Sequence, residues 1–439
     1  MTRALLIAAS GLALALTGCS KPQFTPDKQY GSGARLPDPV QYLFPPMGIA
    51  KPIGWKNGEM PKVPAGFTVQ PFATGLHTPR RVLALANGDV LAVESSGPGT
   101  EPALRPKDIV FGIVIGKAHG PTKAGNDVVL LRDTDGDGKA DQRNVLIPKL
   151  FSPFGIAVSN GKLYVGETDG IREWDFAPGQ TSVSGPGRLV TELPGPPIDH
   201  HWTKDIVVSP DGTKLYAGVG SNSNIVENGL EAEKDRALIF EVELPSGAKR
   251  PFATGLRNPN GLTFNPETGE LWAVINERDE LGNNLVPDYL TSVKEGAFYG
   301  WPWSYYGANV DVRVKPARPD KVRQAIPPDY SLSSHVAPLG LAFAPANWGS
   351  YAGGAFIGEH GSWDRTVFNG YEVAFVPFSG GRPSGPVQHF ATGFIADGKA
   401  HGRPVGVTFG PDGALYVADD VGDVVWRISP TGAKPPVGG

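Results

Sequence analysis

The chain has little cysteine, no large excess of either charge and no long run of apolar residues. Cys19 is the only cysteine among 439 residues, so the sequence predicts a fold without disulfides. The formal net charge of -4 and the isoelectric point of about 6.1 indicate no basic surface, and we expect no nucleic-acid partner. A mean hydropathy of -0.17 excludes a polytopic membrane protein. No C-x-x-C-H motif occurs, which excludes a covalently attached c-type haem.

Glycine and proline, by contrast, are abundant. The chain holds 58 glycines and 43 prolines, together about 23% of its residues, while hydrophobic residues make up 40%. Aromatic and β-branched residues are spread along its whole length. This combination is typical of many short strands joined by many turns, and it predicts an all-β fold rather than a disordered chain.

The N-terminus predicts a lipoprotein signal peptide over residues 1–18. A positive charge precedes an apolar stretch at residues 5–16 that is too short to span a membrane. The sequence Leu-Thr-Gly-Cys that follows resembles a bacterial lipoprotein cleavage site, so we expect lipidation at Cys19. The protein would then be exported and anchored by lipid to the bacterial cell envelope, facing the periplasm. An ordinary signal peptide with an incidental cysteine is the alternative. Residues 19–61, rich in proline and glycine, are expected to form a tether.

Six segments share one pattern, in which an apolar strand, a turn of Gly, Asn or Asp and a second strand follow one another. Asn87-Gly88 and Asp412-Gly413 are two of the turn pairs, whose residues tolerate positive φ. The pattern predicts six β-hairpins, at residues 80–95, 154–168, 205–220, 260–276, 339–360 and 405–420.

A hexapeptide precedes three of these hairpins. It reads PFATGL at residues 71–76 and 251–256, and HFATGF at residues 389–394. We expect each copy to end the outer strand of one blade and to lead the chain toward the centre. Six hairpins predict a six-bladed β-propeller over residues 62–430, with a tail at 431–439. A β-sandwich is the structural alternative.

One insertion in this pattern is acidic. Asp133, Asp135, Asp137 and Asp141 surround Gly138 in the sequence DTDGDGKAD. Alternate carboxylates on a tight loop present hard oxygen ligands to one centre, which suits Ca²⁺. A solvated acidic turn is the alternative, although carboxylates so close together repel one another without a cation. The sequence therefore predicts a structural Ca²⁺ loop.

Polar residues gather in the segments that directly precede or follow the hairpins. Because the loops of all blades meet at one mouth of a propeller's channel, we expect these side chains to lie close together. His200 and His201 each offer an imidazole that can remove a hydroxyl proton near neutral pH. Arg257 and Asn258 offer a planar donor fork and an amide to a flat anionic or carbonyl-bearing ligand. A structural role in packing, capping or a turn is the alternative for each. The same positions of the last two blades hold His360, Arg365 and Arg403.

Three motifs in these segments point to one enzyme family. They are R-N-P-x-G-L at 257–262, Y-G-W-P at 299–302 and P-D-G-x-L-Y-V in the last hairpin. On these motifs the chain resembles the quinoprotein glucose/sorbosone dehydrogenases, which depend on pyrroloquinoline quinone (PQQ). Residues 276–281 and 402–407 are closer to the sorbosone branch. The resemblance implies a six-bladed β-propeller that oxidises an aldose or a sorbosone-like sugar.

The resemblance also implies roles for single residues. The family's catalytic base falls on His201, and Arg257 would face the reacting carbonyl of the quinone. Asn258 would line the site, whereas an aspartate near the family's histidine is replaced here by Ser221.

Charge balance and metal binding follow from the same resemblance. Arg403 matches an arginine that holds a PQQ carboxylate, and Val405 stands where the glucose enzyme has a second arginine. In this family an active-site Ca²⁺ is held by main-chain carbonyls, which here fall around Glu277 and Arg278. As a hypothesis, the missing positive charge is supplied by Lys204, Arg80 or Arg365.

The implied reaction removes a hydroxyl proton from the sugar by His201 while a hydride passes to the quinone. An external electron acceptor, a cytochrome or a quinone, would then reoxidise the cofactor. Two other functions suit the same fold and stay open. One is a calcium-dependent hydrolase of the lactonase type, and the other is a non-catalytic propeller lipoprotein that binds sugar or acts as a scaffold.

Overall fold

The fold is known from a computed structural model, which describes residues 29–42, 47–56, 58–100, 102, 105, 116, 122–197 and 199–432. Residues 1–18 and the predicted lipidation site Cys19 lie outside the described residues, as does most of the predicted tail. Within the described part, no helix is both long and apolar enough to cross a membrane. Regular structure there is mostly strand, which confirms the all-β prediction.

The described residues form six sheets of four or five strands, and most of their strands follow one another along the chain. In order of hydrogen bonding, the first sheet contains β4 (Pro79–Ala84), β5 (Val90–Glu94), β6 (Asp127–Arg132) and β7 (Gln142–Ile147). The second contains β8 (Ile156–Ser159), β9 (Lys162–Glu167), β10 (Gly170–Asp175) and β11 (Arg188–Glu192). The third contains β12 (Ile206–Val208), β13 (Lys214–Val219), β14 (Leu238–Glu243) and β15 (Lys249–Thr254).

The C-terminal half continues this organisation. The fourth sheet contains β16 (Pro259–Phe264), β17 (Leu271–Ile275), β18 (Pro287–Ser292), β21 (Tyr330–Ser334) and, at its edge, β1 (Tyr30–Gly31). The fifth contains β22 (Pro338–Phe343), β23 (Ala355–Glu359), β24 (Glu372–Val376) and β27 (Gln388–Ala391). The sixth contains β30 (Pro404–Phe409), β31 (Leu415–Asp419), β32 (Val424–Pro430) and β3 (Phe67–Thr74). The shorter elements are β2 (Lys51–Pro52), β19 (Ser304–Tyr305), β20 (Asn309–Val310), β25 (Phe378–Ser379), β26 (Arg382–Pro383), β28 (Ile395–Ala396), β29 (Lys399–Ala400), the helix α3 (Pro319–Gln324) and two 3₁₀ turns, Leu230–Glu233 and Ala346–Tyr351.

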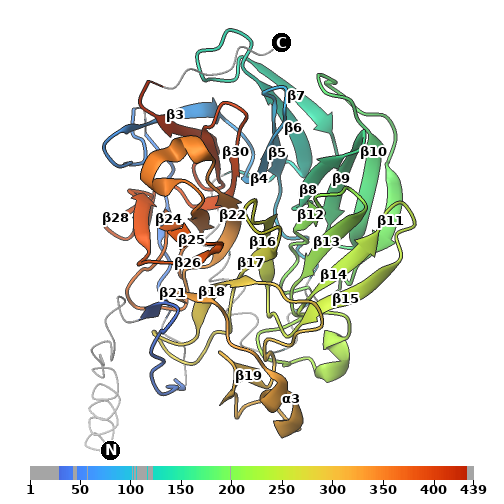
Figure 1. Ribbon diagram of the computed structural model, residues 1–439, viewed down its shortest axis with the longest axis vertical. Helices are drawn as coiled ribbons and strands as arrows, with labels where there is room; N and C mark the ends of the chain where they lie inside the picture. The colour runs from blue at the N-terminus through green and yellow to red at the C-terminus, as the bar shows by residue number, and fades with distance from the viewer. Residues whose placement is uncertain are drawn as a thin grey trace, which may run out of the picture.

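The sheets lie side by side around a common centre, as Figure 1 shows. Their first strands, β4, β8, β12, β16, β22 and β30, contact one another in this order, and β30 in turn contacts β4. The N-terminal strand β3 pairs antiparallel with β32 near the C-terminus, so the two ends of the domain share one sheet. This radial arrangement is that of a β-propeller. The six predicted hairpins are confirmed, since they form the first two strands of the six sheets.

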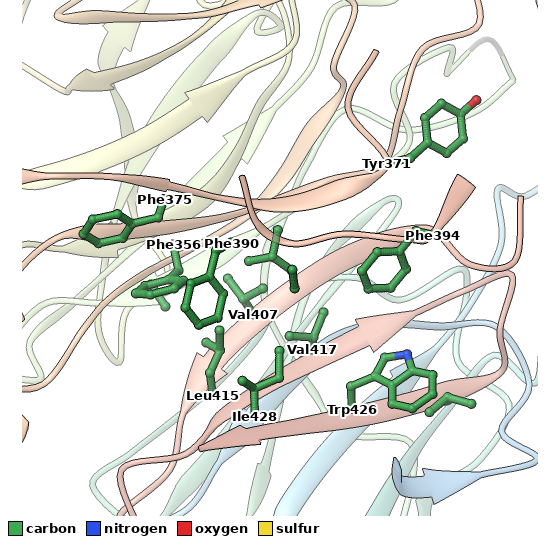
Figure 2. Close-up of a cluster of buried hydrophobic side chains, with 14 of the residues drawn as sticks. Phe356, Tyr371, Phe375, Phe390, Phe394, Val407, Leu415, Val417, Trp426 and Ile428 are labelled. Carbon is green, nitrogen blue, oxygen red and sulfur yellow. The ribbon is translucent and has the colours of Figure 1, made fainter. Parts of the chain in front are cut away.

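The hydrophobic core is divided among the faces between neighbouring sheets. One cluster joins the fifth and sixth sheets, where Phe356 and Phe390 pack toward Val417 and Trp426 (Figure 2). A second cluster joins the sixth sheet to the first, so that apolar side chains hold the last sheet to the beginning of the domain. Full burial of a side chain such as Phe contributes about 1.5 to 3 kcal/mol. The alternating apolar residues of each strand are therefore what holds adjacent sheets together.

The three hexapeptides end outer strands β3, β15 and β27, as predicted. Each contains a β-bulge in which the phenylalanine is the extra residue, namely Phe72, Phe252 and Phe390. The bulge places the ring of Phe72 5.0 Å from that of Tyr416, in the core between two sheets. The hexapeptide thus repeats because the same bulge is needed three times.

The segment predicted to be a free tether lies partly against the sheets. The Gly48 amide donates to the Trp363 carbonyl at 2.9 Å, and β2 pairs with β29. The Trp55 indole donates to Asp419 Oδ2 at 2.7 Å. The predicted tether over residues 19–61 stays a prediction, although residues 29–42 and 47–56 contact the sheets. The contacts of these two segments involve only one or two residues at a time. Their sequences therefore lack the periodic apolar residues that are typical of a strand or a helix.

Candidate functional site

The candidate site lies in the loops that precede the first strands and follow the second strands of the hairpins. We call these loops the mouth. At the centre, Phe154, Trp202, Leu339 and Val405 from four different parts of the ring pack together. Val405 is wholly buried in this contact. The position where the resemblance implies a second arginine is thus filled by apolar packing.

His201 lies in the loop before β12. Its Nδ1 is 3.0 Å from both the carbonyl oxygen and the hydroxyl oxygen of Ser221. That hydroxyl donates its own proton to the Ser223 carbonyl at 2.6 Å, so both Ser221 atoms accept from the imidazole. Nδ1 must therefore carry the proton, and Nε2 holds the basic lone pair. Among the residues that the structure describes, Nε2 has no hydrogen-bond partner.

The environment of His201 keeps the ring neutral. Burial, together with the nearby Arg257 guanidinium and His200, holds the pKa of His201 well below its ordinary value of 6.5. Gly220 brings the main chain against the ring, since a Cβ there would lie 2.4 Å from His201 Cβ and 2.5 Å from Asn258 Oδ1. His201 and Asn258 are thus close together at the mouth, as predicted.

Arg257 directly precedes β16 and is held on every side. Its Nε donates to the Asn224 carbonyl at 3.2 Å, and Nη2 donates to Asn224 Oδ1 and Asp279 Oδ2 at 2.9 and 3.1 Å. Nη1 donates to the carbonyls of Glu277 and Asn276 at 2.6 and 3.4 Å. All five N–H groups therefore have protein acceptors, and the long bond to Asn276 is the one a ligand would replace most easily.

Asn258 offers an unpaired acceptor at the mouth. The side chain is buried, yet its Oδ1 has no hydrogen-bond partner within the described residues. A buried carbonyl without a donor is unfavourable by about 1 to 3 kcal/mol, which a ligand with a suitable donor would offset.

A second group of charged residues joins the two ends of the domain at the mouth. Arg80 Nη1 lies 2.6 Å from Asp420 Oδ2, and the same oxygen lies 2.8 Å from His360 Nε2. The Arg80 guanidinium also lies 5.5 Å from the Trp202 ring, while that of Arg403 lies 5.3 Å from the Tyr371 ring. The Nε atoms of Arg80 and Arg403 are buried and have no partner within the described chain.

The protonation states in this group leave one net positive charge. Burial lowers the pKa of His360 to about 4, although Asp420 opposes the shift. Burial alone would raise the pKa of Asp420. This effect is outweighed by His360, Arg80 and Arg403, which lower the pKa to about 2. At neutral pH two guanidinium groups therefore face one carboxylate and a neutral imidazole.

Lys204 and Arg365 are not brought to these groups. Lys204 is wholly buried, and its Nζ donates to Asp199 Oδ2 at 3.2 Å and to the Trp202 carbonyl at 3.0 Å. Arg236 binds the other oxygen of Asp199 at 2.7 Å. Arg365 donates to the Val367 and Ser334 carbonyls and to Asn284 Oδ1. Both cations are thus neutralised or bonded inside the fold, which does not support the hypothesis that they balance the charge of a cofactor.

Glu277 and Arg278, whose carbonyls were expected to hold Ca²⁺, follow β17. The Glu277 carbonyl accepts from Arg257, as described above. The Arg278 side chain points into the protein, where it is wholly buried and pairs with Glu277 and Asp311 at 3.0 and 3.2 Å. Only the main chain of Arg278 is left for a metal, so ligation by these carbonyls stays a prediction.

The acidic loop lies away from the mouth. Residues 133–141 connect β6 to β7, next to the hairpin turn whose Asp89 pairs with Arg132 at 2.6 Å. Asp133, Asp135 and Asp141 each place one carboxylate oxygen within 4.8 Å of the others. Asp137 is not part of this group. The geometry can hold a cation, and Ca²⁺ binding itself stays a prediction.

A second group that can hold a metal lies beside Arg257. Asp279, His335 and Asp364 also bring one ligand atom each to within 4.8 Å of one another. Burial alone would raise the pKa of Asp279, but the effects of Arg257 and His335 are larger and lower it. At Asp364, by contrast, burial raises the pKa to about 7. These residues therefore form a buried group of titratable side chains that contacts Arg257 through Asp279.

Sequence reasoning missed several of these residues. Asp420 is the last residue of the sixth predicted hairpin, at residues 405–420. Because polar residues next to the other hairpins were already candidates, the same reasoning could have identified Asp420. Asp279 lies in the charged segment after β17, so a local signal existed for it as well. Asp364 directly precedes Arg365 in a segment that already held candidates, whereas Asn224 and His335 lie in loops with no repeat, and nothing in the sequence connects them.

Comparison with known proteins identifies a matching family model and several relatives. The model of the family described as TrAA12-like matches residues 124–293 and 319–431. A PQQ-dependent pyranose dehydrogenase of Coprinopsis cinerea is 25% identical over 428 residues, which cover 83% of this chain and 54% of that protein. An aldose sugar dehydrogenase of Escherichia coli is 27% identical over 192 residues, covering 42% of this chain and 45% of that protein. The chain thus spans about half the length of these two relatives.

The fold has a counterpart among solved structures. The holo form of the pyranose dehydrogenase PQQ domain from Coprinopsis cinerea superposes with a TM-score of 0.68 at 21% sequence identity. The match covers 87% of this chain and 100% of that structure. At this identity the likeness establishes the fold alone.

Proposed function

Because the chain belongs to the TrAA12-like family, we propose that it is an oxidoreductase that uses PQQ to oxidise a sugar, namely an aldose or a sorbosone-like sugar. The relatives named as a pyranose dehydrogenase and an aldose sugar dehydrogenase support this substrate class. The observation that carries the proposal is the fixed neutral imidazole of His201, close to Asn258 and Arg257, whose Nε2 has no partner among the described residues.

The residues at the mouth fit PQQ, a flat molecule with three carboxylates. Among the described residues, the buried Nε atoms of Arg80 and Arg403 lack partners, as does Asn258 Oδ1. Arginine forks are suited to carboxylates, and the net positive charge around Asp420 favours an anionic ligand. Arg80, Arg403 and Asn258 would therefore hold the cofactor, without Lys204 or Arg365.

The chain's own residues supply the proton chemistry. His201 Nε2 would accept the proton of the sugar hydroxyl, and the Ser221 carbonyl would stabilise the resulting imidazolium through Nδ1–H. Arg257, fixed by Asn224, Asp279 and the Glu277 carbonyl, would present positive charge without moving. When bound, PQQ supplies the two-electron acceptor that the protein lacks.

Further parts of the proposal concern architecture and metals. The six sheets would be the blades of a six-bladed propeller, supported by the contact of β30 with β4. Ca²⁺ would bind the acidic loop and, beside the cofactor, the main-chain carbonyls around Glu277 and Arg278. Side-chain oxygens in the loop would come from Asp133, Asp135 and Asp141, whereas the predicted fourth ligand, Asp137, lies outside this group.

Location and electron transfer also belong to the proposal. The protein would be exported and anchored by lipid at Cys19, with its domain in the periplasm. An external cytochrome or quinone would accept the electrons. A Cys19→Ser variant should lose labelling by radioactive palmitate and leave the membrane fraction, and unchanged labelling would contradict the anchor.

Reconstitution tests the enzymatic proposal. The purified protein is mixed with PQQ and Ca²⁺, and quinone absorbance and dye reduction are followed with a panel of aldoses and with sorbosone. A stoichiometric quinone signal with sugar-dependent dye reduction is expected. Absence of PQQ uptake by folded protein would overturn the proposal. Lactone hydrolysis, or sugar binding without turnover, would then identify the hydrolase or the binding protein.

A further inference from the structure

Three side chains from separate segments converge beside Arg257. Asp279 lies in the loop after β17, His335 lies between β21 and β22, and Asp364 lies in the loop after β23. One ligand atom of each lies within 4.8 Å of the other two. All three residues are buried, with exposed fractions of 8%, 6% and 0%.

Each of the three side chains also makes a hydrogen bond to a residue outside the group. The Glu280 amide donates to Asp364 Oδ2 at 2.8 Å, and Arg257 Nη2 donates to Asp279 Oδ2 at 3.1 Å. His335 Nε2 lies 3.2 Å from the Gly282 carbonyl, which can only accept, so this nitrogen carries a proton. Such outer contacts are the means by which proteins orient metal ligands.

The remaining atoms are suited to ligation. His335 Nδ1 lies 3.2 Å from Asp279 Oδ1, which can only accept, so Nδ1 also carries a proton, and a bound cation would displace it. Asp364 Oδ1 is buried and has no hydrogen-bond partner within the described residues. A carboxylate oxygen left without a donor in the interior is costly unless a cation or a donor compensates it.

We propose that Asp279, His335 and Asp364 form a binding site for a divalent transition-metal cation. Two ligands bound to one ion at about 2.1 Å lie about 3.0 Å apart in octahedral geometry and about 3.4 Å apart in tetrahedral geometry. The observed 3.2 Å between Nδ1 and Oδ1 falls between these values. One imidazole with two carboxylates suits zinc, manganese or iron, whereas Ca²⁺ takes oxygen ligands alone.

The cation would position Arg257 through Asp279, whose second oxygen binds that arginine. It would therefore fix the guanidinium at the mouth without touching a substrate. The site is separate from the Ca²⁺ sites proposed above, since it uses neither the acidic loop nor the carbonyls of Glu277 and Arg278. It can be tested without PQQ, so its failure is distinguishable from that of the enzymatic proposal.

Metal content gives a direct test. The full-length protein is stripped with EDTA and titrated with Zn²⁺ by calorimetry, and bound zinc is counted after gel filtration. We expect one equivalent that a 100-fold excess of Ca²⁺ does not displace. Co²⁺ should give visible absorption bands typical of mixed nitrogen and oxygen ligands. Asp364→Asn and His335→Gln should each bind less than about a fifth of an equivalent, whereas the control Asp175→Asn, at an exposed aspartate on β10, should bind as the wild type does.

Two results would overturn the inference. One is wild-type protein, folded by circular dichroism, that retains no zinc and gives no Co²⁺ bands; this result is decisive even where the variants do not fold. The other is unchanged zinc binding in Asp364→Asn and His335→Gln. A loss of stability in His335→Gln without zinc uptake by the wild type would instead identify the histidine as a buried partner for the two carboxylates.

Discussion

His201 Nδ1 lies 3.0 Å from the carbonyl oxygen of Ser221, and this contact decides which nitrogen of the ring is basic. A main-chain carbonyl orients the imidazole here, so the orientation does not depend on the Ser221 side chain. The replacement of the family's aspartate by Ser221 is therefore compatible with the proposed role of His201 as the base.

Removing that base should abolish most of the turnover. We expect His201→Gln to lower kcat by about 10²- to 10⁴-fold while PQQ uptake stays unchanged, because glutamine cannot accept the proton. Ser221→Ala should lose less than about tenfold, since the carbonyl acceptor remains. Steady-state dye reduction at saturating PQQ measures both, with the exposed His389→Gln as a control. Retention of more than a tenth of the activity in His201→Gln would place the base elsewhere.

The pH profile should reflect the same environment. Because burial and Arg257 lower the pKa of His201, its neutral form persists as the pH falls from 8 through 6.5. The acid limb of kcat/KM is therefore expected below 6.5. Arg257→Gln removes a positive charge beside the ring and should shift this limb upward. A wild-type limb at or above 6.5 would contradict the assignment of His201.

Arg403 and Lys204 provide a matched pair of cations. Arg403→Met should weaken PQQ binding by about 1.5 to 3 kcal/mol, or about 10- to 150-fold, because a charge-assisted contact is lost. Lys204→Met should leave PQQ affinity within about threefold but lower the free energy of unfolding by about 3 kcal/mol, because Asp199 loses a buried partner. Titration of PQQ and urea unfolding separate the two effects. Equal losses of affinity would place Lys204 at the mouth.

The strands were predictable because their signals are local. Asn87-Gly88 and Asp412-Gly413 are turn pairs flanked by alternating apolar residues, and the structure has a hairpin at each. The hexapeptide was equally informative, because a bulge with a buried phenylalanine, such as Phe72, needs the same few residues in each strand that contains it.

The site was only partly predictable because its contacts are distant in sequence. Arg80 and Asp420 are separated by 340 positions and meet because the last sheet lies against the first. Lys204 was expected at the mouth from its neighbourhood in the sequence. Its burial is explained by its ion pair with Asp199, whose other oxygen binds Arg236, a residue that no local pattern connects to Lys204.

The acidic loop permits a prediction that is independent of turnover. Asp133 accepts from the Gly136 and Gly138 amides at 2.7 and 2.8 Å, so the loop is already shaped before any cation binds. If Ca²⁺ then joins the carboxylates, it should stabilise the wild type relative to EDTA. The gain is about 2.7 kcal/mol at a free Ca²⁺ concentration 100 times Kd.

Ca²⁺ binding to this loop should raise the Tm of the wild type. In Asp135→Asn, this rise in Tm should be absent. The side chain accepts only a local bond from the Asp137 amide, which asparagine can also accept, so the variant should fold. Because the loop adjoins the hairpin turn of Asp89 rather than the mouth, kcat should be unchanged. Asp175→Asn, an exposed aspartate on β10, is the control and should keep the full shift. Identical Ca²⁺ shifts in Asp135→Asn and wild type would show that the loop is a solvated acidic turn whose carboxylates are satisfied by water and its own amides.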